Sequence, residues 1–183
     1  MKKKGLIITS ENQKIIIVNN DIEFVLIRAG FTDYNLKKNK IKDKNFEENY
    51  NWLKENNIKV GVFYESRATT MLQAKQEVDF FLDIIKNKKF DYPIAIKIED
   101  NHNTIIYSPY SQEIINKKLL RKILKTMYNK LENNGYLTMI MTYESWYKTK
   151  FKKMKCNFLL DNDQNDIIYL DIHNLSKYKQ KYK

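Results

Sequence analysis

Cysteine, histidine and glycine are scarce in this chain of 183 residues, and each scarcity excludes a class of site. The single cysteine, Cys156, excludes an internal disulfide bond, and together with only two histidines, His102 and His173, it cannot form a usual zinc site. The four glycines form no glycine-rich loop after a predicted strand, which argues against a dinucleotide or P-loop site. We therefore expect neither a metal nor a cofactor.

Long hydrophobic runs are missing as well. The opening stretch, MKKKGLIITSENQ, has a basic head, but the apolar run after Gly5 is too short for a signal peptide or a membrane span. We expect the protein to be made in the cytoplasm and to have no membrane span. Access to a cell wall would then need lysis or a secretion machine.

Lysine is what the chain has in excess. The formal net charge is +11, from 33 lysines and arginines against 22 acids, and only Arg28, Arg67 and Arg121 are arginines. Such a charge favours acidic partners, namely nucleic acid, anionic membrane surfaces or anionic cell-wall polymers. The joint abundance of lysine, asparagine and isoleucine is also typical of an AT-rich coding bias, so nucleic acid is the least favoured of these partners.

Short apolar runs alternate with amphipathic stretches along the chain. Strands are predicted at 6–9, 23–30, 58–66, 92–100 and 136–143 and in NFLLDN and DIIYLDI, and helices at 45–57, 71–89, 111–135 and in ESWYKTKFKKM. Strands that alternate with helices predict right-handed βαβ units and a parallel sheet, either doubly wound or closed into a barrel. No linker interrupts the pattern, so we expect one domain over residues 1–183.

In either architecture the chemistry is expected at the carboxyl ends of the strands. Acids and tyrosines gather there, which is typical of carbohydrate sites because carboxylates transfer protons and aromatic rings stack on sugars. The plainer alternative is that the acids are solvated caps of the following helices. The residues at these ends are Ile8 to Ser10, Arg28, Asp33, Tyr64 to Ser66, Lys97, Glu99, Asp100, Thr142, Tyr143, Asp161 and Asp171.

Several motifs occur in a characteristic order. They are GLIITS, FVLIRAG (24–30), DKNFEEN (43–49), VGVFYES (60–66), YPIAIKIED (92–100) and NGYLTMIMTYESWY. In this order the chain resembles glycoside hydrolase family 25, the Chalaropsis-type lysozymes or N-acetylmuramidases that cut the muramic acid linkage of peptidoglycan. The resemblance runs from Gly5 to about Trp146. It implies an α/β fold, an irregular (β/α) TIM-like barrel with shortened C-terminal strands, and a bacterial cell-wall glycan such as peptidoglycan as partner.

The resemblance also assigns catalytic positions, and this sequence departs from the family at several of them. Glu99 matches the family's proton donor, but Lys97 replaces its partner aspartate and Ile7 replaces the aspartate of the first strand. Asp171, with Asp161 behind it, is the candidate for the last aspartate. Four strand-end residues are candidates for substrate binding: Arg28, Tyr64, Glu65 (in place of a tyrosine that lines the family's cleft) and Tyr143.

These substitutions have a physical consequence. A cation within about 4–6 Å lowers the pKa of a carboxyl group by roughly 1–3, so Lys97 would keep Glu99 ionised at neutral pH. General acid catalysis, worth roughly 10²–10⁴-fold, would then be lost. We therefore expect a lysozyme-like protein that is inactive or impaired and acts as a glycan-binding or scaffolding module, in which Glu65 and Lys97 pair across adjacent strands.

Two alternatives stay open. The first is an active muramidase that uses Glu99 with Glu65 or Asp171. The second is a protein-interaction subunit of a phage or secretion assembly. All three functions agree with a basic surface, because cell-wall polymers and many protein complexes are anionic.

Overall fold

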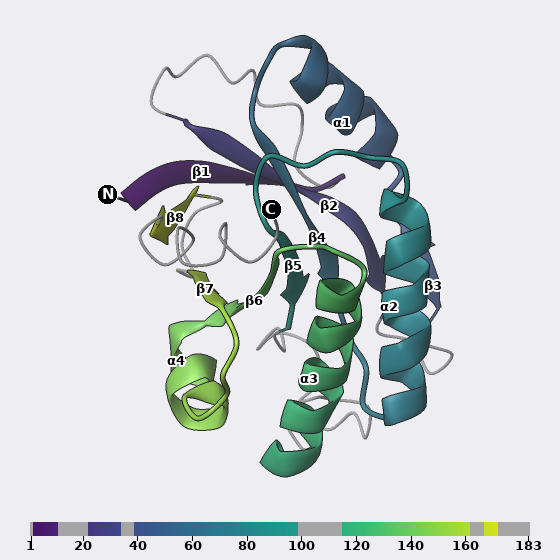
Figure 1. Ribbon diagram of the computed structural model, residues 1–183, viewed down its shortest axis with the longest axis vertical. Helices are drawn as coiled ribbons and strands as arrows, with labels where there is room; N and C mark the ends of the chain where they lie inside the picture. Colours follow the sequence, from purple (N-terminus) through teal and green to yellow (C-terminus); the bar gives the residue numbers. More distant parts are fainter. Residues whose placement is uncertain (1, 11–21, 34–38, 99–114, 162–166, 172–183) are drawn as a thin grey trace.

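The structure is a computed structural model that describes residues 2–10, 22–33, 39–98, 115–161 and 167–171. In this part of the chain, eight strands form one curved sheet (Figure 1). Six of them are parallel: β1 (Lys2–Ile8), β2 (Phe24–Thr32), β4 (Val60–Glu65), β5 (Ile94–Lys97), β6 (Thr138–Tyr143) and β7 (Phe158–Asp161). The order across the sheet is β7-β6-β5-β4-β2-β1-β8; β8 (Ile167–Asp171) is antiparallel to β1, and β3 (Lys40–Lys42) is antiparallel to β2.

Helices connect successive parallel strands and pack on the outer face of the sheet (Figure 1). They are α1 (Phe46–Glu55), α2 (Met71–Ile85), α3 (Lys117–Asn133) and the short α4 (Glu144–Trp146), which continues into the π-helical turn η1 (Tyr147–Phe151). The sheet curls so far that its edge strands β7 and β8 touch. This half-barrel confirms the predicted α/β fold. In the described residues no helix is both long and apolar enough to cross a membrane.

The sheet separates two apolar cores because successive residues of a strand point to opposite faces. The outer core lies between the sheet and the helices. The inner core fills the curl of the sheet and consists of Ile7, Phe24, Leu26, Phe63, Ala95, Met139, Met141 and Leu159. At the amino ends of the strands, the rings of Phe24 and Tyr92 stack with their centroids 4.3 Å apart. The inner face is therefore packed with apolar side chains below the carboxyl edge of the sheet.

Two glycines make room for large neighbours in the inner core. A Cβ atom on Gly5 would lie 2.3 Å from the Phe24 ring, and one on Gly61 would lie 2.4 Å from Cδ2 of Leu26. Real Cβ atoms essentially never come this close to another atom, so positions 5 and 61 must be glycine if Phe24 and Leu26 are to keep their places.

Replacing Gly61 by alanine tests this close packing. Gly61→Ala should lower the free energy of unfolding by about 1–3 kcal/mol, because the new methyl group overpacks the inner core against Leu26. At roughly 2–4 °C per kcal/mol this is a loss of several degrees in Tm, measurable by calorimetry. The control Lys59→Ala alters an exposed residue just before the same strand and should change stability by no more than about 0.5 kcal/mol. Equal Tm values for the two variants would contradict the packing argument.

Candidate functional site

The candidate site lies at the carboxyl edge of the sheet, on its inner face, directly above the inner core. Arg28 near the end of β2 and Glu65 at the end of β4 meet there, with Arg28 Nη1 3.3 Å from Glu65 Oε2. Lys97 at the end of β5 pairs in register with Glu65, and Tyr143 at the end of β6 pairs in register with Asp161. The structure thus brings four predicted strand-end positions, Arg28, Glu65, Lys97 and Tyr143, to one edge of the sheet.

A bulge in β2 shapes this edge. The register with β4 shifts between Arg28 and Gly30, so Ala29 is an extra residue in the strand. Because of this insertion both Arg28 and Phe31 lie on the inner side, and the Arg28 guanidinium sits 4.5 Å from the centroid of the Phe31 ring. The Phe31 ring therefore covers one face of the Arg28 guanidinium. The guanidinium N–H groups lie in the plane of the group and remain available for hydrogen bonds.

The Arg28 guanidinium is almost fully buried, and three partners surround it. Its Nε donates to Asp43 Oδ2 at 2.9 Å, Nη2 donates to Ser10 Oγ at 3.2 Å, and Nη1 donates to Glu65. Only 5% of the side chain is exposed. Such burial is tolerated because a buried charge with complete hydrogen bonds avoids most of the desolvation cost.

Asp43 ties three elements to one another. Its Oδ2 accepts from the backbone N–H of Ser10 as well as from Arg28, and its Oδ1 accepts from the N–H of Asn45. Its own N–H donates to the carbonyl of Ala29. The carboxylate thereby joins the end of β1, the bulge of β2 and the start of α1.

Glu65 and Glu77 extend the network to α2. Glu65 Oε1 accepts from Arg67 Nη2, so each oxygen of Glu65 accepts from a different arginine. Glu77, buried on α2, accepts from Ser66 Oγ at 2.5 Å and from the N–H of Arg67 at 3.3 Å. Within the described residues, no three histidine, cysteine or acidic side chains gather where they could hold a metal ion. The described side chains at this edge form a network of ion pairs.

The predicted pairing of Glu65 with Lys97 stays a prediction. The two Cα atoms are neighbours in the register, and Lys97 is half-buried. Two guanidinium groups, however, already balance the Glu65 carboxylate before Lys97 is counted. Glu99 lies outside the described residues, so its predicted role and the effect of Lys97 on its pKa stay predictions too.

The structure gives the positions of Ile7, which replaces a family aspartate, and of Asp171, the candidate for the last aspartate. Ile7 is 5% exposed and packs in the inner core with Leu26 and Phe63. Asp171 pairs with Lys2, at the amino end of β1, because β8 runs antiparallel to β1. The prediction that Asp171 supplies the last aspartate therefore conflicts with the fold, which puts this residue at the edge opposite Lys97. Asp161, at the end of the parallel strand β7, occupies the carboxyl edge in its place.

The structure does not bring Tyr64 to the site. Its ring is fully buried on the helix side of the sheet, against Phe80 and Phe81, and its hydroxyl is 2.8 Å from Thr32 Oγ1. Burial raises the pKa of the Tyr64 phenol well above its usual range. Tyr64 and Glu65 are neighbours on one strand, so only one of them can face inward, and it is Glu65. The predicted substrate contact of Tyr64 therefore has no structural support.

Three residues of the network were not predicted to belong to the site: Asp43, Arg67 and Glu77. Asp43 opens the DKNFEEN motif just before a predicted helix, where an acid is typical of a local cap, so the sequence does not mark it as a site residue. The rarity of arginine in a lysine-rich chain was a usable signal for Arg67, because bidentate or buried pairing favours arginine over lysine. Nothing in the sequence distinguishes Glu77 from the other acids of its helix.

Comparisons with known proteins agree with this geometry. The model of the family described as glycosyl hydrolases family 25 matches residues 11–159. A family 25 glycosyl hydrolase from Bacillus anthracis superimposes with a TM-score of 0.69 at 17% identity, covering 89% of this chain and 71% of that one. For a family GH25 lysozyme from Aspergillus fumigatus the TM-score is 0.64 at 18% identity, with 87% and 77% covered.

The modular autolysin LytC from Streptococcus pneumoniae, solved in complex with a synthetic peptidoglycan ligand, superimposes with a TM-score of 0.67 at 20% identity. The match covers 82% of this chain but only 35% of the autolysin, so the chain spans about a third of that protein's length. Among curated protein sequences, none matches this chain. At these identities the structural matches establish a shared fold.

Removing the charge of Asp43 tests the buried network. Asp43→Asn should lower the free energy of unfolding by about 3–5 kcal/mol, because Arg28 loses a buried counter-charge. The matched control is Asp83→Asn, which removes a carboxylate from the Asp83–Lys86 pair, where both side chains are about two-thirds exposed. That change should cost less than about 1 kcal/mol. Urea unfolding of both variants gives the comparison, and similar losses would show that the network contributes no more than a surface pair.

The buried Tyr64 phenol predicts a loss of stability at alkaline pH. Its pKa is raised in the folded state, so above about pH 10 the unfolded chain releases this proton while the folded chain retains it. The free energy of unfolding should therefore fall as the pH rises from 10 to 11. Tyr64→Phe should be less stable at pH 7, since the hydroxyl of Thr32 loses its partner, but should show a shallower alkaline loss. Parallel curves from urea unfolding at pH 7–11 would contradict this assignment.

Proposed function

The chain belongs to glycosyl hydrolase family 25, and from this premise we propose that it binds a peptidoglycan-type glycan at the carboxyl edge of its sheet without cleaving it. The family membership gives the lysozyme-like fold and the class of ligand. The loss of cleavage is inferred from the residues that stand at the acid positions.

The observation that carries the proposal is the environment of Ile7. The resemblance puts a carboxylate at this position, and the side chain here is an isoleucine packed among Leu26 and Phe63 with 5% of its surface exposed. An apolar side chain stabilises no developing positive charge on a sugar ring. The inner core has closed around it, so a water molecule cannot take the place of the missing carboxylate.

The charges at the edge also disfavour glycoside cleavage. A glycosidase needs one carboxyl group that donates a proton and a second group that stabilises an oxocarbenium-like transition state. Glu65 accepts charge-assisted hydrogen bonds from Arg28 and Arg67, so its two oxygens are already engaged in ion pairs. Lys97 adds a cation where the family pattern has an acid. Nearby cations oppose the positive charge that develops in such a transition state.

The alternative of an active muramidase is less well supported. Of the acids it would combine with Glu99, Glu65 is bound by two arginines and Asp171 lies at the opposite edge of the sheet. The alternative of a protein-interaction subunit has no specific contact in its favour. Glycan binding has one, because the half-buried Tyr143 stands at the carboxyl edge beside a rigid polar network, where its ring could stack on a sugar.

Two assays on the purified protein separate binding from cleavage. We expect the protein to sediment with insoluble peptidoglycan and to leave the turbidity of that suspension, and its reducing-sugar content, unchanged over hours. An active family 25 lysozyme serves as the positive control for cleavage. Lysis at a comparable rate would overturn the proposal, and so would a failure to sediment with peptidoglycan.

The binding edge is tested by Tyr143→Ala. Loss of a stacking ring should weaken glycan binding about fivefold or more, since about 1 kcal/mol corresponds to a factor of five. Trp52→Ala is the matched control, because it removes an exposed aromatic ring from α1 on the outer face. Co-sedimentation isotherms of both variants give the comparison. Equal weakening, or no effect of Tyr143→Ala, would remove the carboxyl edge from the proposal.

A further inference from the structure

The positive charge of the protein is concentrated in one part of the chain. Residues 117–160 contain eleven of the 33 lysines and arginines but only two of the 22 acids, Glu132 and Glu144. This quarter of the sequence therefore carries nine of the eleven net positive charges, and the remainder is nearly neutral. A uniform coding bias towards lysine would not separate lysines from acids in this way.

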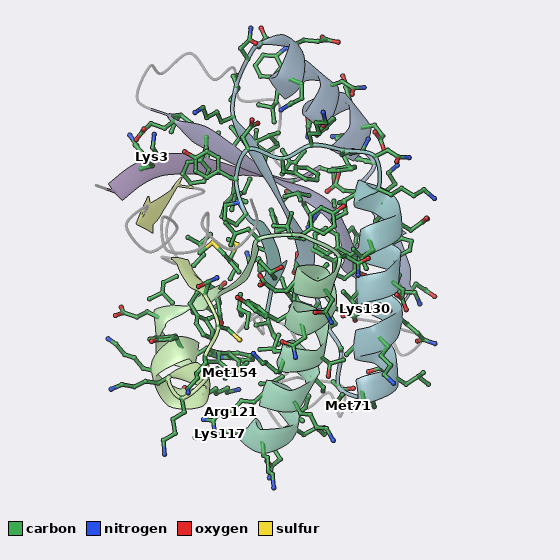
Figure 2. The ribbon with its side chains drawn as sticks, in the orientation of Figure 1. Lys3, Met71, Lys117, Arg121, Lys130 and Met154 are labelled. Atoms are coloured by element: carbon green, nitrogen blue, oxygen red, sulfur yellow. The ribbon has the colours of Figure 1, made fainter. Side chains whose placement is uncertain are left out.

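The first half of this charge lies on one face of α3. Except for Leu119, the apolar residues of the helix are buried in the outer core, and its lysines occupy the opposite side. Lys118 and Lys122 are one turn apart, about 6 Å along the axis, and Lys117, Arg121 and Lys125 form a parallel row. Lys130 is set apart, since it faces α2 and pairs with Asp79 (Figure 2).

The second half lies on η1 and the turn that follows it, directly beside α3. Arg121 Nε donates to the carbonyl of Lys150 at 2.5 Å, and Lys125 Nζ lies 4.0 Å from Sγ of Cys156. Figure 2 shows Lys117 and Arg121 on the side of α3 that faces Met154. We call the joint patch the basic surface; its exposed lysines are Lys117, Lys118, Lys122, Lys125, Lys148, Lys152, Lys153 and Lys155.

The basic surface adjoins the candidate site. α4 begins at Glu144, immediately after Tyr143 at the carboxyl edge, and η1 follows within one turn. α3 runs back toward the amino edge, where β6 starts, so its first turn with Lys117 and Lys118 lies at the carboxyl side of the sheet. A ligand that lies along the basic surface would thus reach the edge that carries Tyr143.

The lysines at the start of α3 are unfavourably placed for the stability of the fold. The first turn of α3 carries Lys117 and Lys118 and no acid, although the helix dipole favours negative charge at this end. Lysines one turn apart on a helix repel one another by a few tenths of a kcal/mol per pair. An anionic ligand would relieve both penalties.

The chemistry of the surface identifies the kind of anion. Its charges are lysines, which act as mobile point charges and lack the planar fork with which arginine reads a base or a single phosphate. Of its aromatic side chains, Tyr128 and Trp146 are buried, and Tyr147 is half-buried with its ring against Phe158, so none offers an open platform for stacked bases. Apart from Leu119, whose exposed fraction is 37%, the apolar side chains of α3 are buried, so the surface has little to insert into a lipid bilayer. A flexible polymer with evenly spaced charges and no bases fits these features best.

We propose that the basic surface binds the phosphodiester backbone of an anionic cell-wall polymer, a polyol phosphate. This proposal rests on the proposed function only in that it places the protein in the cell wall, because a chain that binds peptidoglycan meets such polymers there. Binding releases counterions from the polymer, so the affinity falls steeply with salt. The candidate site and the basic surface would then contact two components of one wall.

Two variants with equal net charge test the proposal. The surface variant replaces Lys117, Lys118, Lys122 and Lys125 by glutamine. The control variant replaces four exposed lysines elsewhere in the chain by glutamine: Lys44, Lys59, Lys75 and Lys89. Both lower the net charge by four, and thermal unfolding verifies that both are folded. The probe is purified poly(glycerol phosphate), titrated from about 0.05 to 0.3 M salt, with DNA and anionic vesicles at equal phosphate concentration as competitors.

The surface variant should bind poly(glycerol phosphate) about tenfold or more weakly at 0.1 M salt, with a salt slope lower by roughly 3. The control variant should bind within about threefold of the wild type. Equal losses in both variants would overturn the proposal, because net charge alone would then account for binding. Unchanged binding by the surface variant, or stronger binding to DNA or vesicles than to the polymer, would also overturn it.

Peptidoglycan stripped of phosphate separates this proposal from the proposed function. The wild type and both variants should bind the stripped material equally, because it contacts the carboxyl edge only. If none of them binds it while the wild type still binds poly(glycerol phosphate), the proposed function fails and the basic surface stands.

Discussion

The burial of the Arg28 guanidinium is the constraint on which the rest of the carboxyl edge depends. A charge removed from water costs several kcal/mol unless its donors find acceptors, and here the acceptors come from Ser10 after β1, Asp43 before α1 and Glu65 on β4. Each of these elements must therefore stay in register with the others. Apolar residues could fill the same volume at no loss of stability. What the ions add is a fixed geometry, since four segments distant in the sequence are locked around one side chain.

The same network changes what the edge can do. A family of glycoside hydrolases concentrates carboxylates where a sugar cation develops, whereas at this edge Asp43 and Glu65 bind Arg28 and Arg67, and Lys97 adds a further cation. Asp43 and Glu65 are therefore engaged in ion pairs that hold the fold. In the proposed function, the fold keeps the scaffold that orients a glycan while these acids no longer serve cleavage, which would be a route by which an enzyme framework becomes a receptor.

The sequence predicts the parallel sheet and its helices well because periodicity and the alternation of elements are local signals. β3 was missed since its three residues are all exposed and show no apolar pattern. The errors at the site have other causes. Tyr64 was assigned from its position near a strand end, without regard to the alternation that turns it outward, and Asp171 from chain order, without the reversal of β8. The pairing of Arg67 with Glu65 and of Ser66 with Glu77 depends on how α2 packs, which no local pattern encodes.

The uneven distribution of lysines gives the molecule an electric dipole. Within the part of the chain that the structure describes, the excess of positive charge lies over α3 and η1, and the carboxyl edge of the sheet lies at the same end. In the field of any dense polyanion such a molecule rotates before contact, so that the edge with Tyr143 arrives first. Orientation of this kind shortens the rotational search that limits most encounters between macromolecules. Long-range electrostatics would thus align the protein before the proposed short-range contacts at the carboxyl edge form.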